Sequence, residues 1–208
     1  GFYNQTKDLQ VLTVLTTPVV YTLVQNAGKS RSLGVEGSLA VDVTKNLRIK
    51  ATGAYVDPKY LEYVDPVTHA DLSNSRFNNV GKGQVSVDAN YKIDRYAFNV
   101  NYNWFSKKPN SWQSLSYLTA AYGATNAATL MGITTTPAHS ILNLRASADF
   151  GKYDVSVWGK NILNARYKQD NTLMPGLFNT STWNDPVTYG VTFAANVGVP
   201  DNIPVRKL

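Results

Sequence analysis

The sequence predicts an all-β fold, a transmembrane antiparallel β-barrel, from three observations. Seven segments alternate apolar and polar residues with a period of two, as a strand with one apolar and one polar face does. Apart from 87–91, each segment approaches the ~9–11 residues that a tilted strand needs to cross a bilayer. Short and long connections alternate between these segments, and aromatic residues flank the apolar faces.

The seven segments form three predicted hairpins and a final strand. In the clearest segment, Leu142, Leu144 and Ala146 point to one face while Asn143 and Arg145 point to the other. The period restarts after the two residues 151–152, which is typical of a hairpin turn. The segments cover residues 33–43, 47–55, 87–91, 96–104, 142–150, 153–160 and 187–197.

The N-terminal residues resemble two further strands, 2–14 and 19–24, followed by a short link, 25–32. The total is then about nine strands, whereas single-chain bacterial barrels use even numbers. An open edge in lipid leaves backbone groups unsatisfied, at several kcal/mol each. We therefore expect residues 1–197 to be the C-terminal portion of a larger exported barrel. Residues 198–208 are expected to be a periplasmic tail or an added extension.

The connections predict an orientation. Residues 44–46, 93–95 and 151–152 are short turns, whereas 56–82, 106–138 and 163–185 are long polar loops. Outer-membrane barrels place short turns in the periplasm and long loops outside the cell. Aromatic residues on the apolar face form two predicted interfacial girdles. One girdle comprises Tyr91, Tyr96, Phe150 and Tyr153 beside the short turns, and the other comprises Tyr55, Tyr102, Trp104 and Tyr189.

Composition excludes several classes of protein. The chain has 208 residues, 43% of them hydrophobic, and a mean hydropathy of −0.24. Lumen-facing polar residues lower this average in any barrel. No apolar run approaches the ~18 residues of a membrane helix. The chain has no cysteine and two histidines, and its net charge of +6 is scattered, so we expect neither a cofactor nor a nucleic-acid site.

Three local motifs, in this order and spacing, carry a resemblance to a known family. They are Asn26-Ala27-Gly28-Lys29 with Gly34-Val35-Glu36, then Gly159-Lys160-Asn161-Ile162-Leu163-Asn164-Ala165-Arg166-Tyr167, then Thr188-Tyr189-Gly190-Val191-Thr192. Together they resemble the C-terminal barrel half of TonB-dependent outer-membrane receptors. One departure is Val197, where such receptors end the last strand on an aromatic residue.

The resemblance implies a barrel of 22 strands in the bacterial outer membrane, plugged by an N-terminal domain. It implies import of a scarce ligand, a ferric siderophore by default, with energy delivered by the TonB complex through the plug. On that pattern the chain supplies about the last nine strands. Two other interpretations remain open at this point: a passive porin-like barrel, and a soluble all-β binding module such as a lectin-like sandwich.

The residues themselves give no support for catalysis or metal binding. His139 and Ser140 are neighbours on a predicted strand, so their side chains point to opposite faces. His69 lies in a loop with Asp65 and Asp71, but carboxylate-rich loops are more often simply solvated.

Ionisable residues on the polar face are expected to point into the lumen, because a charge facing lipid costs up to ~2–4 kcal/mol. They are Glu36, Asp42, Arg48, Lys50, Asp88, Arg145, Asp154 and Lys160. One interpretation is that they pair along the wall or against the plug. The other is that Arg145 and Lys160 line the path of an anionic ligand.

Aromatic residues of the long loops are candidates for contact with the ligand, since they offer contact area at low entropic cost. They are Tyr60, Tyr63, Trp112, Tyr117, Tyr122, Phe178 and Trp183. The alternative is that they pack the loops against one another.

Overall fold

The computed structural model describes residues 1–15, 21–64, 69, 71–110, 119, 122–174 and 178–195. Within these ranges, the side chains of 11–15, 21–23, 25, 27, 172–174 and 178–179 are not described. The statements below refer to the described part of the chain.

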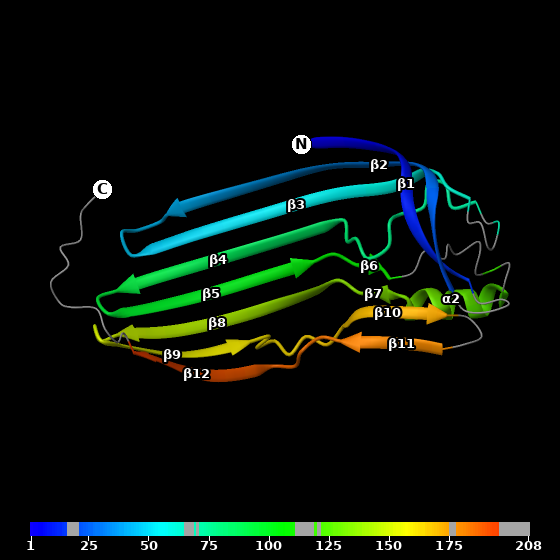
Figure 1. The fold of residues 1–208 in the computed structure, drawn as a ribbon. Helices are drawn as coiled ribbons and strands as arrows, with labels where there is room; N and C mark the ends of the chain where they lie inside the picture. Colours follow the sequence, from blue (N-terminus) through cyan, green and yellow to red (C-terminus); the bar gives the residue numbers. More distant parts are fainter. Residues whose placement is uncertain are drawn as a thin grey trace.

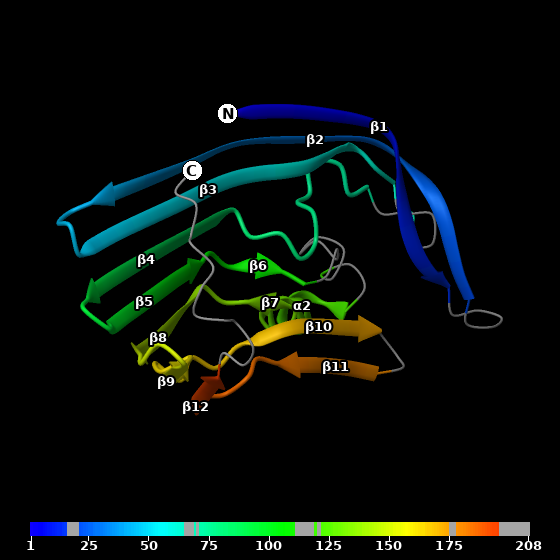
Figure 2. The ribbon, with the colours of Figure 1, turned by 60° about the vertical axis from the view of Figure 1, so that its left-hand side comes forward.

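One antiparallel sheet of eight strands dominates the structure (Figures 1 and 2). Its strand order follows the chain, so each strand pairs with the next long strand in sequence. The strands are β1 (Phe2–Leu15), β2 (Tyr21–Asp42), β3 (Leu47–Glu62), β4 (Gly83–Ile93), β5 (Tyr96–Phe105), β8 (His139–Asp149), β9 (Tyr153–Lys160) and β12 (Thr188–Ala195). This meander is the arrangement of an up-and-down barrel wall.

The predicted short turns all lie at one end of the sheet (Figure 1). Thr44 organises the first of them, because its Oγ1 accepts the backbone N–H of Leu47 at 3.0 Å. Asp94 and Gly151 adopt positive φ angles of 50° and 79° in the other two. Asp149 holds the last turn by accepting the N–H of Gly151 at 2.6 Å.

The strand registers confirm the predicted faces. Val87 lies opposite Ala51 on β3 and Tyr102 on β5, so apolar side chains line up across three strands. Its neighbour Ser86 lies opposite Thr52 and Asn103 on the other face.

The apolar face is open rather than covered by a second sheet. Leu39, Phe193 and Val191 are 65%, 64% and 70% exposed, far more than residues of a soluble core. Rings at both ends of this face are also exposed, including Tyr91, Tyr96, Phe150, Tyr153, Tyr55 and Tyr189. These features fit a sheet that faces lipid between two aromatic girdles and do not fit a soluble sandwich.

One predicted strand boundary is wrong. Residues 21–24 do not form a separate strand, because β2 continues through 25–32 and pairs with both β1 and β3, and residues 19–20 of the predicted strand lie outside the described residues. A glycine is needed within this stretch, since a Cβ on Gly28 would lie 2.6 Å from the carbonyl oxygen of Glu62. The turn-like residues 26–29 are therefore a close contact inside a long strand, and the described sheet has eight strands rather than about nine.

The long loops also contain more regular structure than predicted. β3 extends to Glu62, beyond the predicted start of the loop at residue 56. Shorter elements lie together beyond the end of the sheet opposite the turns (Figures 1 and 2). They are β6 (Lys108–Pro109), α2 (Ala124–Ile133), β7 (Thr135–Thr136), β10 (Lys168–Met174) and β11 (Phe178–Trp183). None of the described helices is long and apolar enough to cross a membrane.

Arginine substitutions at two adjacent residues of β4 test the face assignment in the complete receptor. Val87→Arg places a charge toward hydrocarbon near mid-strand, and we expect it to destabilise the inserted barrel by ~2–4 kcal/mol. Ser86→Arg, the matched control, points to the lumen and should cost much less. The measurement is urea unfolding in lipid vesicles. Equal losses for the two variants would contradict the assignment.

Candidate functional site on the lumen face

A chain of side-chain hydrogen bonds crosses the polar face of the sheet. Asn101 Nδ2 donates to Asp88 Oδ1 at 2.8 Å, and Asn143 Nδ2 donates to Asn101 Oδ1 at 3.0 Å. Asn143 Oδ1 then accepts the backbone N–H of Asn161 at 3.0 Å. The chain links β4, β5 and β8 to the residue after β9. Polar side chains that bond one another hold this part of the wall in a fixed arrangement.

Asn161 anchors the loop that leaves β9. Its side chain donates to the carbonyl oxygens of Ala165 and Asp185, both at 3.0 Å, and accepts the N–H of Ala165 at 3.0 Å. Asn161 and Asn164 have φ angles of 49° and 48°, a left-handed conformation that asparagine tolerates better than most residues. The motif at 159–167 is thus the sequence of a tight exit from a strand.

Arg145 and Lys160 lie on the lumen face of the neighbouring strands β8 and β9. Arg145 is the register partner of Trp158, and Lys160 Nζ lies 5.4 Å from the centre of the Trp158 ring. Both cations are exposed, and neither forms an ion pair with a described carboxylate. An aromatic ring beside one cation, with a second cation on the neighbouring strand, suits an anionic ligand with a flat, polarisable group.

Trp158 lies on the polar face of β9 opposite Arg145, and the sequence pattern did not identify it as a site residue. Its indole Nε1 donates to Thr192 Oγ1 at 3.1 Å, and its ring lies against Gly190, where a side chain would collide. The signal was present in the sequence: a tryptophan on the polar face of a strand needs a small residue opposite it. Gly190 supplies that space within the third motif.

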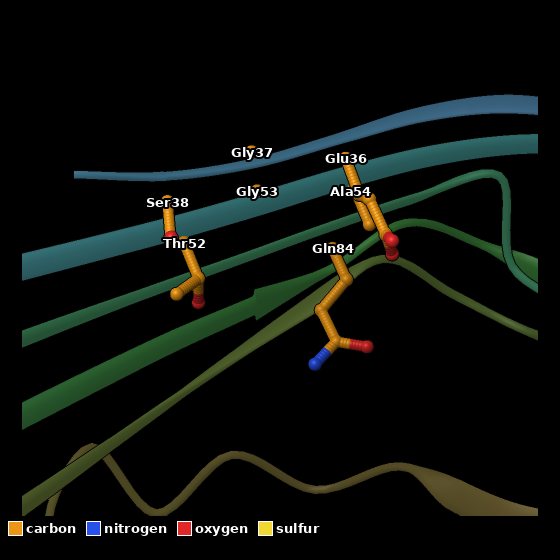
Figure 3. Close-up of a pocket in the computed structure, with 7 residues that line it drawn as sticks. All are labelled: Glu36, Gly37, Ser38, Thr52, Gly53, Ala54 and Gln84. Carbon is orange, nitrogen blue, oxygen red and sulfur yellow. The ribbon is translucent and has the colours of Figure 1, made fainter. Parts of the chain in front are cut away.

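A polar hollow lies between β2, β3 and β4, with a volume of 450 Å³. Figure 3 shows Glu36, Ser38, Thr52 and Gln84 pointing to the same side. Gly37 and Gly53 are paired across β2 and β3 beside these residues. The hollow therefore offers a carboxylate, two hydroxyls and an amide to the lumen.

The predicted loop aromatics are divided between buried and exposed positions. Tyr60 and Tyr63 are only 6% and 3% exposed and pack with Leu72, with Leu9 and Phe77 against them. They form a small core under the loop that follows β3, and contact of these two tyrosines with ligand stays a prediction.

Two other aromatics lie nearer the surface. Tyr122 is partly buried just before α2, and Trp183 is 55% exposed with Lys168 Nζ 5.9 Å from its ring centre. Trp112, Tyr117 and the side chain of Phe178 lie outside the described residues.

The two long loops after β5 and β9 are joined into one body by buried polar contacts. Thr136 is fully buried, accepts a hydrogen bond from Asn110 Nδ2 at 2.8 Å and donates to the carbonyl oxygen of Lys168 at 2.7 Å. Asn79 N–H donates to the carbonyl oxygen of Pro109 at 2.7 Å, which adds the loop after β3. The long-loop end of the sheet is therefore a connected structure above the lumen wall.

The structure separates His139 from Ser140. Ser140 Oγ lies 2.8 Å from the Tyr102 hydroxyl on the outward face, where Ser140 pairs with Trp104. His139 lies on the other face, with its ring centre 5.2 Å from that of Phe105 and 3.6 Å from that of Tyr167. Because their side chains lie on opposite faces, His139 and Ser140 do not form a nucleophile and base pair. Burial raises the pKa of the Tyr167 hydroxyl, whose ring stacks on His139.

Metal ligands do not gather in the described residues, which contain no group of three His, Cys, Asp or Glu side chains suited to an ion. His69 is exposed, and Asp65 lies outside the described ranges. The Asp71 side chain accepts the N–H of Ser73 at 2.8 Å, and hydrogen bonds from Ser73 lower the pKa of Asp71. Asp71 thus stabilises a local turn.

Comparisons with known proteins agree with this geometry. A family model described as "TonB dependent receptor-like, beta-barrel" matches residues 1–162. The ferric yersiniabactin uptake receptor FyuA of Yersinia pestis is similar in structure, with a TM-score of 0.66 and 17% identity over 92% of this chain and 26% of that one. The siderophore receptor PiuA of Acinetobacter baumannii gives a TM-score of 0.64 and 14% identity over 92% and 24%.

A third similar structure is the copper transporter OprC, with a TM-score of 0.63 and 9% identity over 92% of this chain and 27% of that one. The chain thus spans about a quarter of the length of these solved structures. At these identities the structural similarity shows a shared fold.

Glycine substitutions test the anchor at the exit of β9. Asn161→Gly keeps the left-handed backbone but removes three hydrogen bonds, so we expect it to cost about 2 kcal/mol more than the control. The control is Asn164→Gly, which has nearly the same φ angle and loses only a long contact of 3.5 Å to Val187 N. Hydrogen exchange of the amides of 161–167 should be about thirtyfold faster in Asn161→Gly. Similar rates in both variants would show that the side-chain bonds contribute little.

Proposed function

Because this chain belongs to the TonB-dependent receptor β-barrel family, we propose that it supplies the C-terminal strands of a receptor that imports a ferric siderophore. It is an outer-membrane β-barrel chain, and its apolar face lies against lipid. In this proposal residues 1–197 form barrel wall, and 198–208 follow it on the periplasmic side. Energy comes from the TonB complex, acting through a plug domain of the complete receptor.

The observation that carries the proposal is the pair of cations on the lumen wall, Arg145 on β8 and Lys160 on β9, with the Trp158 ring beside Lys160. Ferric chelates of catecholate and carboxylate donors are anionic, and many carry aromatic rings. Cations without a carboxylate partner attract such a ligand by long-range electrostatics. The Trp158 ring offers a surface for stacking.

In this proposal the connected long loops make the first contact with the ligand. Trp183 and Tyr122 lie on the structure that caps the long-loop end, and loops held on a rigid wall commonly carry recognition. A ligand captured there meets the lumen wall next. Opening of the path then depends on rearrangement of the plug, which the resemblance to the family implies.

The relatives support import rather than catalysis. FyuA is named as a ferric yersiniabactin uptake receptor, PiuA as a siderophore receptor and OprC as a copper transporter. A ferric siderophore is therefore the first candidate, and other metal chelates come next.

The complete receptor, purified in neutral detergent, tests the proposal by tryptophan fluorescence quenching with a panel of probes. The panel contains an anionic ferric catecholate, ferric citrate, a neutral ferric hydroxamate and cobalamin. We expect saturable binding of at least one iron chelate at micromolar concentration or below. Binding of none of these probes, together with steady ion conduction in planar bilayers, would instead indicate a passive porin.

Charge neutralisation tests the assigned residues. The double variant Arg145→Gln, Lys160→Gln should bind the anionic chelate at least about tenfold more weakly, because it loses two lumen charges. The control is Lys45→Gln, Lys152→Gln, which changes net charge equally but lies in two short turns. The control should bind normally, and loss of affinity in both variants alike would point to a nonspecific charge effect.

A further inference from the structure

The outward face of the sheet changes character at Tyr55. Below Tyr55, toward the turns, this face of β3 is apolar, with Leu47, Ile49 and Ala51. Above Tyr55 the same face carries Asp57 and Lys59, and the register places Arg31 of β2 opposite Lys59. The register is regular from Val35 opposite Tyr55 to Arg31 opposite Lys59, so these side chains share the face that meets lipid lower down.

Three cations surround one carboxylate at this level. The Asp57 carboxylate lies 2.5 Å from Lys82 Nζ, 3.7 Å from Lys59 Nζ and 4.0 Å from an Arg31 guanidinium nitrogen. Asp57 is covered, with 12% of its side chain exposed, whereas the side chains of Arg31, Lys59 and Lys82 are 29%, 30% and 36% exposed. One carboxylate cannot neutralise three cations, so the group keeps a net positive charge.

The cationic group lies at the level of the aromatic girdle near the long-loop end. Lys82 Nζ lies 6.0 Å from the centre of the Tyr55 ring, so the cations begin directly at the aromatic girdle. Charges at the bilayer centre are costly, but at a girdle they meet the headgroups of the lipid. The long-loop end faces the cell exterior in barrels of this kind, so these are headgroups of the outer leaflet.

Further basic residues lie near this cationic group on the same outward face. Arg76 forms an isolated bridge with Lys59, which places it on the same face, and Lys7 pairs with Lys29 farther along β1 and β2. Glu62 contacts Lys29 at 2.6 Å and is the second carboxylate here. Positive charge therefore extends over β1, β2 and β3 above the girdle.

We propose that Arg31, Lys59 and Lys82 bind phosphate groups in the headgroup of an anionic outer-leaflet lipid. Asp57 lies among the three cations and neutralises only part of their charge, and their partly exposed side chains donate to the phosphate oxygens. Charge-assisted bonds of this kind are stronger than neutral ones. The proposal depends on the outer-membrane placement of the barrel and not on which ligand it imports.

The test measures lipid A binding to the complete receptor in neutral detergent by native mass spectrometry. Lys59→Gln, Lys82→Gln should bind lipid A about thirtyfold more weakly, since each basic residue near an anionic lipid surface contributes a comparable share. The control Lys45→Gln, Lys152→Gln removes the same charge at the turn end and should bind normally. Equal losses in both variants, or no loss in the first, would overturn the proposal.

Two further arms separate headgroup binding from a structural role of the group and from binding of free phosphate. Asp57→Asn removes the negative charge among the cations and should tighten lipid A binding. If the cations only stabilise the fold, the same variant should instead bind lipid A more weakly. Dephosphorylated lipid A keeps its acyl chains but should bind much more weakly. Inorganic phosphate at the same phosphate concentration should not displace lipid A. Equal binding of the dephosphorylated lipid, or displacement by inorganic phosphate, would contradict the proposal.

Discussion

Satisfaction of backbone hydrogen bonds inside hydrocarbon is the constraint on which the rest of this structure depends. A strand in lipid must pair its N–H and C=O groups with neighbouring strands, because no water is available to do so. The meander from β1 to β12 pairs every inner strand of the described sheet on both sides, and each strand then has one face toward lipid and one toward the lumen. Alternation of residues such as Ser86 and Val87 is the chemical consequence.

The same constraint determines at which level of the sheet, and on which face, polar and charged side chains can lie. Polar side chains within the bilayer are confined to the lumen, so the amide chain through Asn101 and the cations Arg145 and Lys160 share one surface. Above the Tyr55 girdle the outward face is released from this requirement, and charges reappear there around Asp57. Receptor function and lipid contact are thus proposed for opposite faces of one sheet.

The lipid-crossing part of the fold could be predicted because its signal is local and repeated. Period-two alternation identified the strands and their faces, and the turns followed from the breaks in the period. The course of β2 through Gly28 could not be predicted in this way. Residues 26–29 have the sequence of a turn, and only their pairing with β1 and β3 overrides that local preference. Trp158 was missed as a site residue because its role depends on Gly190 across the sheet. The burial of Tyr60 and Tyr63 likewise depends on contacts with Leu72, which no local pattern contains.

The most direct test of the central claim is the accessibility of single cysteines along β4, since this chain has no cysteine of its own. Each residue from 85 to 91 of the complete receptor is replaced in turn and spin-labelled in lipid vesicles. Odd positions should then be accessible to oxygen dissolved in the hydrocarbon, and even positions to a water-soluble nickel complex. Uniform accessibility along the strand, or the opposite phase, would contradict the account.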